Sequence, residues 1–169
     1  MTTRIGFYHL QRSSIEETLP RLLEKALAAG SRVVVMAGSA ERVAYFDSLL
    51  WTWRPDSWLP HGTARGGDAA LQPIFLTEQD ENPNAADILF LTDGAVSGEV
   101  ERYARCLTLF DGRDAVAVQA ARAHWKEWLA RGFELTYYQQ TDSGGWQEKA
   151  RGGQRGSEGT GEEEANGKR

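Results

Sequence analysis

The stretch Val33-Val34-Val35-Met36 decides the fold class of this chain, because it places apolar side chains on both faces of any strand that it forms. A strand buried on both faces is typical of the centre of a parallel sheet that helices cover on both sides. The stretch therefore predicts the central strand of an α/β sheet.

Strand and helix patterns alternate on both sides of this central strand. Further apolar runs predict strands at 4–10, 74–76, 88–91, 107–110 and 133–138. Helical patterns follow Ser14 and Ser39, and a long one fills 114–131 before Gly132. This alternation predicts a three-layer, Rossmann-like fold, in which a mostly parallel sheet carries helices on both of its faces.

The composition changes near residue 145, which marks the predicted end of the folded domain. Residues 151–169 contain no side chain more apolar than alanine and include the acidic run Glu162-Glu163-Glu164. A segment of this kind buries too little apolar surface to offset the entropy lost on ordering. We therefore predict one α/β domain over 1–145 and a disordered tail, rich in glycine and glutamate, over 146–169.

The bulk properties restrict the classes of function. A net charge of −5 over 169 residues disfavours non-specific nucleic-acid binding, which needs basic residues that neutralise several phosphates. Cys106 is the single cysteine, so an internal disulfide is excluded and a reducing compartment is favoured. No segment approaches the roughly 18 apolar residues that span a bilayer, and we expect a cytoplasmic location without membrane contact.

The residue types that carry phosphate binding, metal binding and nucleophilic catalysis are missing or isolated. The turn after the first predicted strand, Gln11-Arg12-Ser13-Ser14, has no glycine-rich loop to bring backbone N–H groups to a phosphate. His9, His61 and His124 have no second histidine or cysteine at ligand spacing. Cys106 lies in a predicted buried strand, where a thiol is inert. We expect no catalysis, no cofactor and no metal.

The stretch from Leu50 to His61 holds three of the six tryptophans, namely Trp51, Trp53 and Trp58. Two interpretations are equally open from the spacing alone. The tryptophans either cover a small additional core or form a docking surface, because tryptophan is enriched at binding hot spots.

The predicted helix 114–131 has two distinct sides. At 100° per residue one arc contains the apolar side chains of Val118, Ala121, Trp125, Trp128 and Leu129, which we expect to pack on the sheet. Arg122 and Lys126 are four residues apart and form a cationic ridge beside Trp125. Such a ridge suits a peptide that ends in an apolar side chain and a carboxylate, although solvated helix borders often look the same.

A series of short motifs resembles the chi subunit of bacterial DNA polymerase III holoenzyme. The motifs are Phe7-Tyr8, Gly30-Ser31-Arg32-Val33, Leu50-Trp51, Arg54-Pro55, Ser57-Trp58-Leu59-Pro60-His61, Asp87-Ile88-Leu89 and Arg131-Gly132-Phe133. The tryptophan-rich stretch, followed by Gly66-Gly67, is the most specific part. The likeness extends over about 4–138, and the order and spacing of the motifs carry it.

The resemblance implies a Rossmann-like domain without catalysis that links other proteins. In the family, an aromatic pair in the tryptophan-rich stretch contacts the psi subunit of the clamp loader, and Trp51 and Trp58 match that pair. An arginine, an aromatic residue and a lysine on the last long helix bind the acidic C-terminal tail of single-stranded DNA-binding protein. The matching residues are Arg122, Trp125 and Lys126.

Two positions depart from the family's tail-binding site. Val118 stands where the family has a lysine, and Asp111 stands where it has an apolar residue of the pocket. The loss of one cation and the gain of one carboxylate are expected to weaken the binding of an acidic peptide.

These observations predict an accessory subunit that joins the clamp loader, through psi, to single-stranded DNA-binding protein and contacts DNA only indirectly. The leading alternative is a direct nucleic-acid-binding module, and a degenerate nucleotide hydrolase is the third hypothesis. The negative net charge opposes the former, and the missing phosphate loop opposes the latter.

Overall fold

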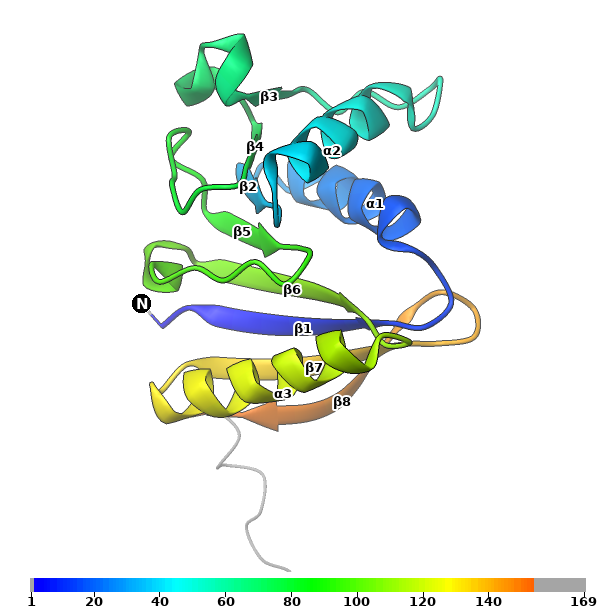
Figure 1. Ribbon diagram of the computed structural model, residues 1–169, viewed down its shortest axis with the longest axis vertical. Coiled ribbons are helices and arrows are strands. Elements are labelled where there is room, and N and C mark those ends of the chain that lie inside the picture. The colour runs from blue at the N-terminus through cyan, green and yellow to red at the C-terminus, as the bar shows by residue number, and fades with distance from the viewer. Residues whose placement is uncertain (1, 154–169) are drawn as a thin grey trace, which may run out of the picture.

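The computed structural model describes residues 2–153, which form one sheet with helices on both faces (Figure 1). The elements follow in the order β1 (Arg4–Leu10), α1 (Ile15–Ala28), β2 (Val33–Met36), α2 (Ala40–Thr52), β3 (His61–Thr63), β4 (Ile74–Thr77), β5 (Ile88–Leu91), β6 (Arg105–Asp111), α3 (Ala115–Ala130), β7 (Glu134–Gln140) and β8 (Trp146–Gly152). Short 3-10 turns lie at Ala64–Gly66, Ala69–Leu71 and Val100–Arg102.

The eight strands are ordered β3-β4-β2-β5-β6-β1-β7-β8. All neighbours pair in parallel except β7 and β8, which are antiparallel. The predicted fold class, a mostly parallel sheet in a three-layer α/β domain, is confirmed. The short strand β3 was not predicted, because its three residues carry no apolar run that sequence patterns can detect.

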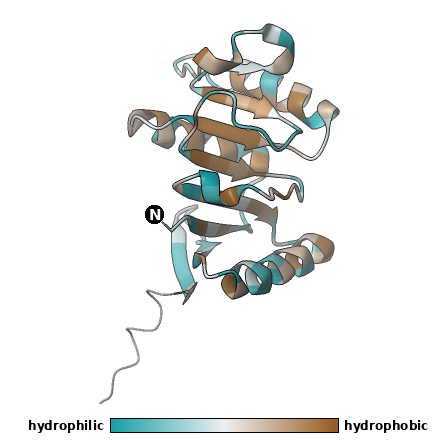
Figure 2. Ribbon diagram, turned by 90° about the vertical axis from the view of Figure 1, so that its left-hand side faces the viewer, coloured by the Kyte–Doolittle hydropathy of each residue, from teal (hydrophilic) through white to brown (hydrophobic). Residues whose placement is uncertain are grey.

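Each face of the sheet has its own hydrophobic core. The side chains of β2 point alternately into the two cores. Val33 and Val35 face α1 and α2, whereas Val34 and Met36 face the opposite side. Leu19, Leu23, Phe46 and Leu50 supply the helical side of the first core, and Ala121 and Trp128 of α3 supply that of the second. Figure 2 shows the apolar central strands between these layers.

The helix boundaries follow from capping side chains. The Ser14 hydroxyl accepts a hydrogen bond from the Glu17 backbone N–H at 3.3 Å, which starts α1 as the sequence predicts. The Asp114 carboxylate accepts from the N–H groups of Val116 and Ala117 and starts α3. Gly132 ends α3 with a φ of 86°, a left-handed conformation that glycine adopts without strain.

Strand β1 lies between β6 and β7, which come from the C-terminal half of the chain. The connection from β6 to β7 must therefore cross β1, and α3 makes this crossing (Figure 1). As a result α3 lies against Phe7 of β1, whose ring centroid is 5.2 Å from that of Trp125 and 5.6 Å from that of Trp128.

The prediction that the folded domain ends at residue 145 is wrong. Residues Trp146–Gly152 form β8, which pairs with β7 from Leu135 to Gln140. A turn around Gly144 connects the two strands, and the Thr141 N–H donates to the Gly145 carbonyl at 2.8 Å. Trp146 anchors the strand, because its ring contacts that of Tyr8 with centroids 5.0 Å apart.

The amino-acid composition gave a wrong domain boundary because β8 is an edge strand with few apolar side chains. Glu148, Lys149 and Arg151 are exposed, and charged residues of this kind protect a sheet edge from pairing with other chains. The strand obtains its stability from the β7 ladder and from Trp146 rather than from a hydrophobic pattern of its own. The remainder of the predicted tail, 154–169, lies outside the described residues.

Trp128 provides a test of the second core, since its side chain is 2% exposed and its ring packs edge-on against Phe7. We expect Trp128→Ala to lower the free energy of unfolding by about 3–5 kcal/mol, because it leaves a large cavity. Val116→Ala is the matched control on the same helix, since Val116 is 78% exposed and its loss should cost less than about 0.5 kcal/mol. Equal effects of the two changes in urea titrations would contradict this packing.

Candidate functional site

A cavity of about 670 Å³ lies between α3 and the adjoining strands and contains the predicted peptide-binding residues. The helix contributes Val118, Arg122, Trp125 and Lys126, while Phe7, His9, Phe110 and Tyr137 come from β1, β6 and β7, and Ala150 comes from β8. We call this cavity the α3 pocket. The structure thus brings Arg122, Trp125 and Lys126 together at one pocket, as their helical spacing predicts.

The α3 pocket combines an aromatic interior with a basic rim. Phe7 is buried and Trp125 is half-buried, and these rings offer an apolar surface to a ligand side chain. Arg122 and Lys126 are exposed, and neither has an ion-pair partner among residues 2–153. Arg131 at the end of α3, in contrast, pairs with Glu101 at 3.6 Å.

His9 and Tyr137 form a hydrogen-bonded pair inside the α3 pocket, between the His9 Nδ1 atom and the Tyr137 hydroxyl. Burial lowers the pKa of His9, and the negative charge of Asp111 opposes this shift. Burial raises the pKa of Tyr137, while the positive charge of Arg122 acts in the opposite direction. A neutral imidazole and a neutral phenol are thus favoured in the interior, which leaves the positive charge at the rim.

The two positions that depart from the family pattern have different surroundings. Val118 lines the α3 pocket and leaves it without a third cation on the helix. Asp111 lines a neighbouring crevice instead, and its carboxylate binds Arg113 at 3.0 Å. That hydrogen bond lowers the pKa of Asp111, so the carboxylate is ionised but accompanied by a cation.

The second predicted surface consists of Trp51 and Trp58, which we call the tryptophan surface. Trp51 belongs to the last turn of α2 and is 61% exposed, and Trp58 lies in the following loop and is 78% exposed. Trp53, in contrast, is half-buried and packs against the first core. Trp53 therefore helps to cover a core, whereas the other two side chains are open to solvent and their role as a docking surface stays a prediction.

Several polar contacts hold the loop that carries the tryptophan surface. Arg54 binds Glu24 of α1 at 3.0 Å, and the Ser57 hydroxyl donates to the same carboxylate. The Nε2 atom of the buried His61 lies 2.9 Å from a carboxylate oxygen of Asp47. The Trp51 ring packs against the His61 ring, with the two ring centroids 4.6 Å apart. Exposed tryptophans on a tethered loop lose little conformational entropy on binding.

The α3 pocket and the tryptophan surface lie at opposite ends of the sheet order. Helix α2 packs against β3 and β4 at one end, and α3 packs against β6 and β7 toward the other (Figure 1). The two surfaces therefore share no element of the sheet or of the helices.

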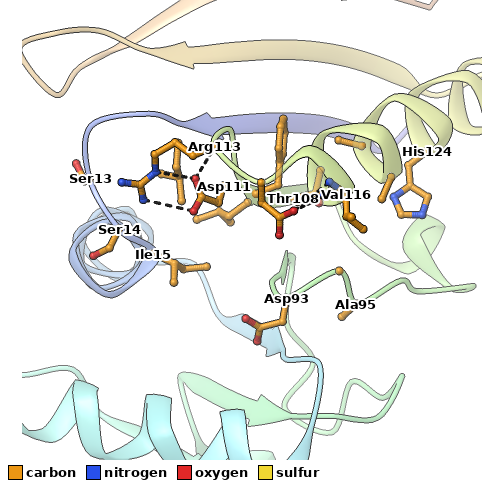
Figure 3. A pocket seen from close by; sticks show the side chains of 18 of the residues that line it. Ser13, Ser14, Ile15, Asp93, Ala95, Thr108, Asp111, Arg113, Val116 and His124 are labelled. Carbon is orange, nitrogen blue, oxygen red and sulfur yellow. Dashed lines mark hydrogen bonds and ion pairs between the residues drawn. The ribbon is translucent and has the colours of Figure 1, made fainter.

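A crevice of about 460 Å³ lies where β1 and β6 send their connections to opposite faces of the sheet. Nucleotides bind at this switch point in many doubly wound folds. Figure 3 shows Ser13, Ser14 and Ile15 at the start of α1, with the paired Asp111 and Arg113 near them and His124 farther along.

The crevice is poorly suited to phosphate. The side chains of Ser14 and Asp114 already cap the two helices that begin there and bind one N–H group of α1 and two of α3, which leaves fewer donors for a phosphate. Asp93 and Asp111 add negative charge, and the Arg113 guanidinium is bound to Asp111. This geometry opposes the hypothesis of a degenerate nucleotide hydrolase.

The remaining candidate groups do not form a reactive or metal-binding cluster within residues 2–153. Cys106 is 1% exposed, and burial raises the pKa of its thiol, which suits the predicted inert core residue. In the same part of the chain, no group of three or more His, Cys, Asp or Glu side chains is arranged to hold a metal ion. No helix described here is long and apolar enough to cross a membrane.

The fold and these surfaces define a class of protein, an α/β domain of Rossmann type whose exposed features suit protein docking. Within this class the chain belongs to the family described as DNA polymerase III chi subunit, HolC, whose model matches residues 1–136. The family resemblance predicted from the sequence motifs is confirmed.

Two curated relatives carry the same description. The chain is 27% identical over 103 residues to the probable DNA polymerase III subunit chi of Rickettsia prowazekii, covering 59% of this chain and 62% of the relative. It is 26% identical over 136 residues to the DNA polymerase III subunit chi of Pseudomonas aeruginosa, covering 79% of this chain and 94% of the relative.

Sequence reasoning missed the pocket residues that come from strands. The sequence predicts His9 and Tyr137 only as residues of the strands 4–10 and 133–138, and it places Ala150 in the predicted tail. His9 and Tyr137 could have been found from the alternation of side chains between the two faces of β1 and β7, because it puts both residues on the face that α3 covers.

The depressed pKa of His9 predicts a pH dependence of stability. A histidine whose folded pKa lies below the ordinary value of 6.5 stabilises the fold above that pH, and this contribution is lost as pH falls through the folded pKa. We expect the free energy of unfolding to fall on acidification from about pH 7.5 to about pH 5, and less so in His9→Gln. A titration midpoint of the His9 ring at or above 6.5 by NMR would contradict the burial argument.

Proposed function

We propose that this chain is a non-catalytic adaptor of the DNA polymerase III holoenzyme. The α3 pocket binds the acidic C-terminal tail of single-stranded DNA-binding protein, and the tryptophan surface binds the clamp loader through its psi subunit. The observation that carries this proposal is the convergence of Arg122, Trp125 and Lys126 on one aromatic pocket. Membership of the chi family supports it independently.

The chemistry of the α3 pocket matches a peptide that ends in an apolar residue. The terminal side chain packs against Trp125 and Phe7, where burial of apolar surface stabilises the complex. The terminal carboxylate receives two parallel hydrogen bonds from the Arg122 guanidinium, a geometry that lysine cannot offer. Lys126 attracts the acidic residues upstream, and its contribution on an exposed rim is about 0–1 kcal/mol.

Two sequence changes set the strength of this contact. The absence of a cation at Val118 removes one attraction for the acidic peptide. Asp111 should weaken peptide binding less than an unpaired carboxylate would, because Arg113 binds it and it lines the neighbouring crevice. We therefore expect a modest affinity that one added cation improves.

The separation of the two surfaces supports a bridging role. A clamp loader bound at the α2 end of the sheet leaves the α3 end free for single-stranded DNA-binding protein. The adaptor would then keep the clamp loader close to coated single-stranded DNA without touching the DNA itself. A direct nucleic-acid-binding module would behave differently, since its capture by coated DNA would survive removal of the partner's C-terminal residues.

Arg122 is the residue whose loss should weaken peptide binding most. We expect Arg122→Ala to cost about 1.5–3 kcal/mol, because it removes a charge-assisted and partly buried hydrogen bond. Lys126→Ala should cost about 0–1 kcal/mol and mainly at low salt. Val118→Lys should tighten binding. Isothermal titration with a peptide of the cognate C-terminal sequence measures all three.

Arg131→Ala is the matched control for Arg122→Ala, because Arg131 caps the C-terminal end of the same helix but pairs with Glu101 outside the pocket. It should bind the peptide like the wild type. If Arg122→Ala also binds like the wild type, the site assignment fails. If the wild type itself does not bind, the proposed function fails.

Trp58 tests the tryptophan surface. Truncation of a hot-spot tryptophan typically costs about 2 kcal/mol or more, so Trp58→Ala should weaken clamp-loader association about 30-fold. The domain should remain folded, because the side chain is 78% exposed. Leu71→Ala, at another exposed apolar residue, should leave association unchanged. Unfolding of the Trp58 variant in a melting experiment would instead favour a core role.

A further inference from the structure

Strand β8 lies beyond the part of the chain that the family model matches. The match ends at residue 136, within β7, whereas β8 occupies Trp146–Gly152. The strand is nevertheless part of the same sheet and pairs with β7 along most of its length. The question is therefore what this added strand does at the edge of the α3 pocket.

The two faces of β8 have different roles. Trp146 faces the first core, where it packs on Tyr8. Glu148 pairs with Arg151 by an ion pair and lies opposite Tyr138, which belongs to that same face. Ala150 lies opposite Tyr137 and lines the α3 pocket.

The register that presents Ala150 depends on a bulge. Glu148 pairs with Tyr138 but Ala150 pairs with Tyr137, so Lys149 is an extra residue on β8. A small, uncharged side chain therefore stands opposite Tyr137, in the wall of the pocket. Position 150 is thus close to the peptide proposed to bind there.

Gly152 lets the edge of α3 rest on the backbone of β8. A Cβ atom at this position would lie 2.9 Å from Leu129 Cδ1 and 3.2 Å from Trp125 Cζ2. Either distance is too short for an undisturbed contact, so any side chain here forces the Trp125 or Leu129 side chain to move. The Trp125 ring is therefore positioned from two sides, by Phe7 of β1 and by Gly152 of β8.

From these contacts we infer that β8 is a functional wall of the α3 pocket. It positions Trp125 through Gly152 and presents residue 150 to the acidic C-terminal peptide. This inference rests on the proposed function. Because Val118 supplies no cation, the charge at position 150 becomes a determinant of affinity, and the short apolar side chain of Ala150 admits the peptide without attracting it.

Opposite charges at position 150 test the inference. Ala150→Lys should tighten the binding of the synthetic C-terminal peptide up to about fivefold, and Ala150→Glu should weaken it by a similar factor, since a rim charge contributes up to about 1 kcal/mol. Both effects should shrink at high salt. Gly152→Val should weaken binding at least as much as Ala150→Glu, because it displaces Trp125.

Glu148→Gln is the matched control, because it changes the net charge by the same amount as Ala150→Lys but on the opposite face of β8. It should leave the peptide affinity unchanged. Melting temperatures of all variants establish that the fold is retained, and a merely structural role of β8 cannot produce effects of opposite sign for lysine and glutamate.

The possible outcomes distinguish a failure of the inference from a failure of the proposed function. If the wild type binds the peptide and both Ala150 variants bind with the same affinity, β8 is not part of the pocket, and the inference is overturned while the proposed function stands. If Glu148→Gln tightens binding as much as Ala150→Lys, the effect is one of net charge and the inference is again overturned. If the wild type does not bind, the proposed function and the inference fall together.

Discussion

The pairing of β1 with both β6 and β7 is the constraint on which the rest of the structure depends. It joins Arg4 to Arg105 on one side and to Glu134 on the other, so strands far apart in sequence must meet before either ladder forms. The entropy of closing such loops is offset by burial of Ile5 and Phe7 under α3. Because β1 lies between β6 and β7, the connection between them must cross β1, and the preference for right-handed crossovers selects the face on which α3 lies over β1.

This route explains why α3 contributes both to the second core and to the α3 pocket. Ala121 and Trp128 face the sheet and belong to the second core, while Arg122 and Lys126 stand at the border of the buried stripe. Trp125 is half-buried between these two regions and contacts Phe7. A residue in this position is held rigidly by the core on one side and remains available to a ligand on the other, which reduces the entropic cost of binding.

The doubly wound topology also leaves a crevice at its switch point. The switch crevice between β1 and β6 persists, because the topology requires it, but carboxylates and capping side chains occupy the places where phosphate would bind. The features that suit binding lie instead at the outer elements, α2 with its following loop at one end of the sheet and α3 with β8 at the other. The two surfaces therefore lie far apart in the strand order and do not overlap.

The sequence by itself determined the elements that carry strong local patterns. The run Val33-Val34-Val35-Met36 and the capping residues Ser14 and Ser39 predict a parallel sheet and two helix starts, because strand period, burial on both faces and capping are local properties. The ridge of Arg122 and Lys126 was predictable for the same reason, since residues four apart share a helix face.

Tertiary structure alone decided what surrounds that ridge. The pairing of β1 with β7 brings His9 and Tyr137 together, and no local pattern encodes a contact between residues so distant in sequence. Strand β8 was missed because its order comes from the β7 ladder and from the contact of Trp146 with Tyr8, whereas its own composition is polar. The pocket wall at Ala150 and the close approach of Gly152 to Trp125 therefore exist only once the sheet has formed, because long-range pairing rather than local hydrophobicity stabilises them.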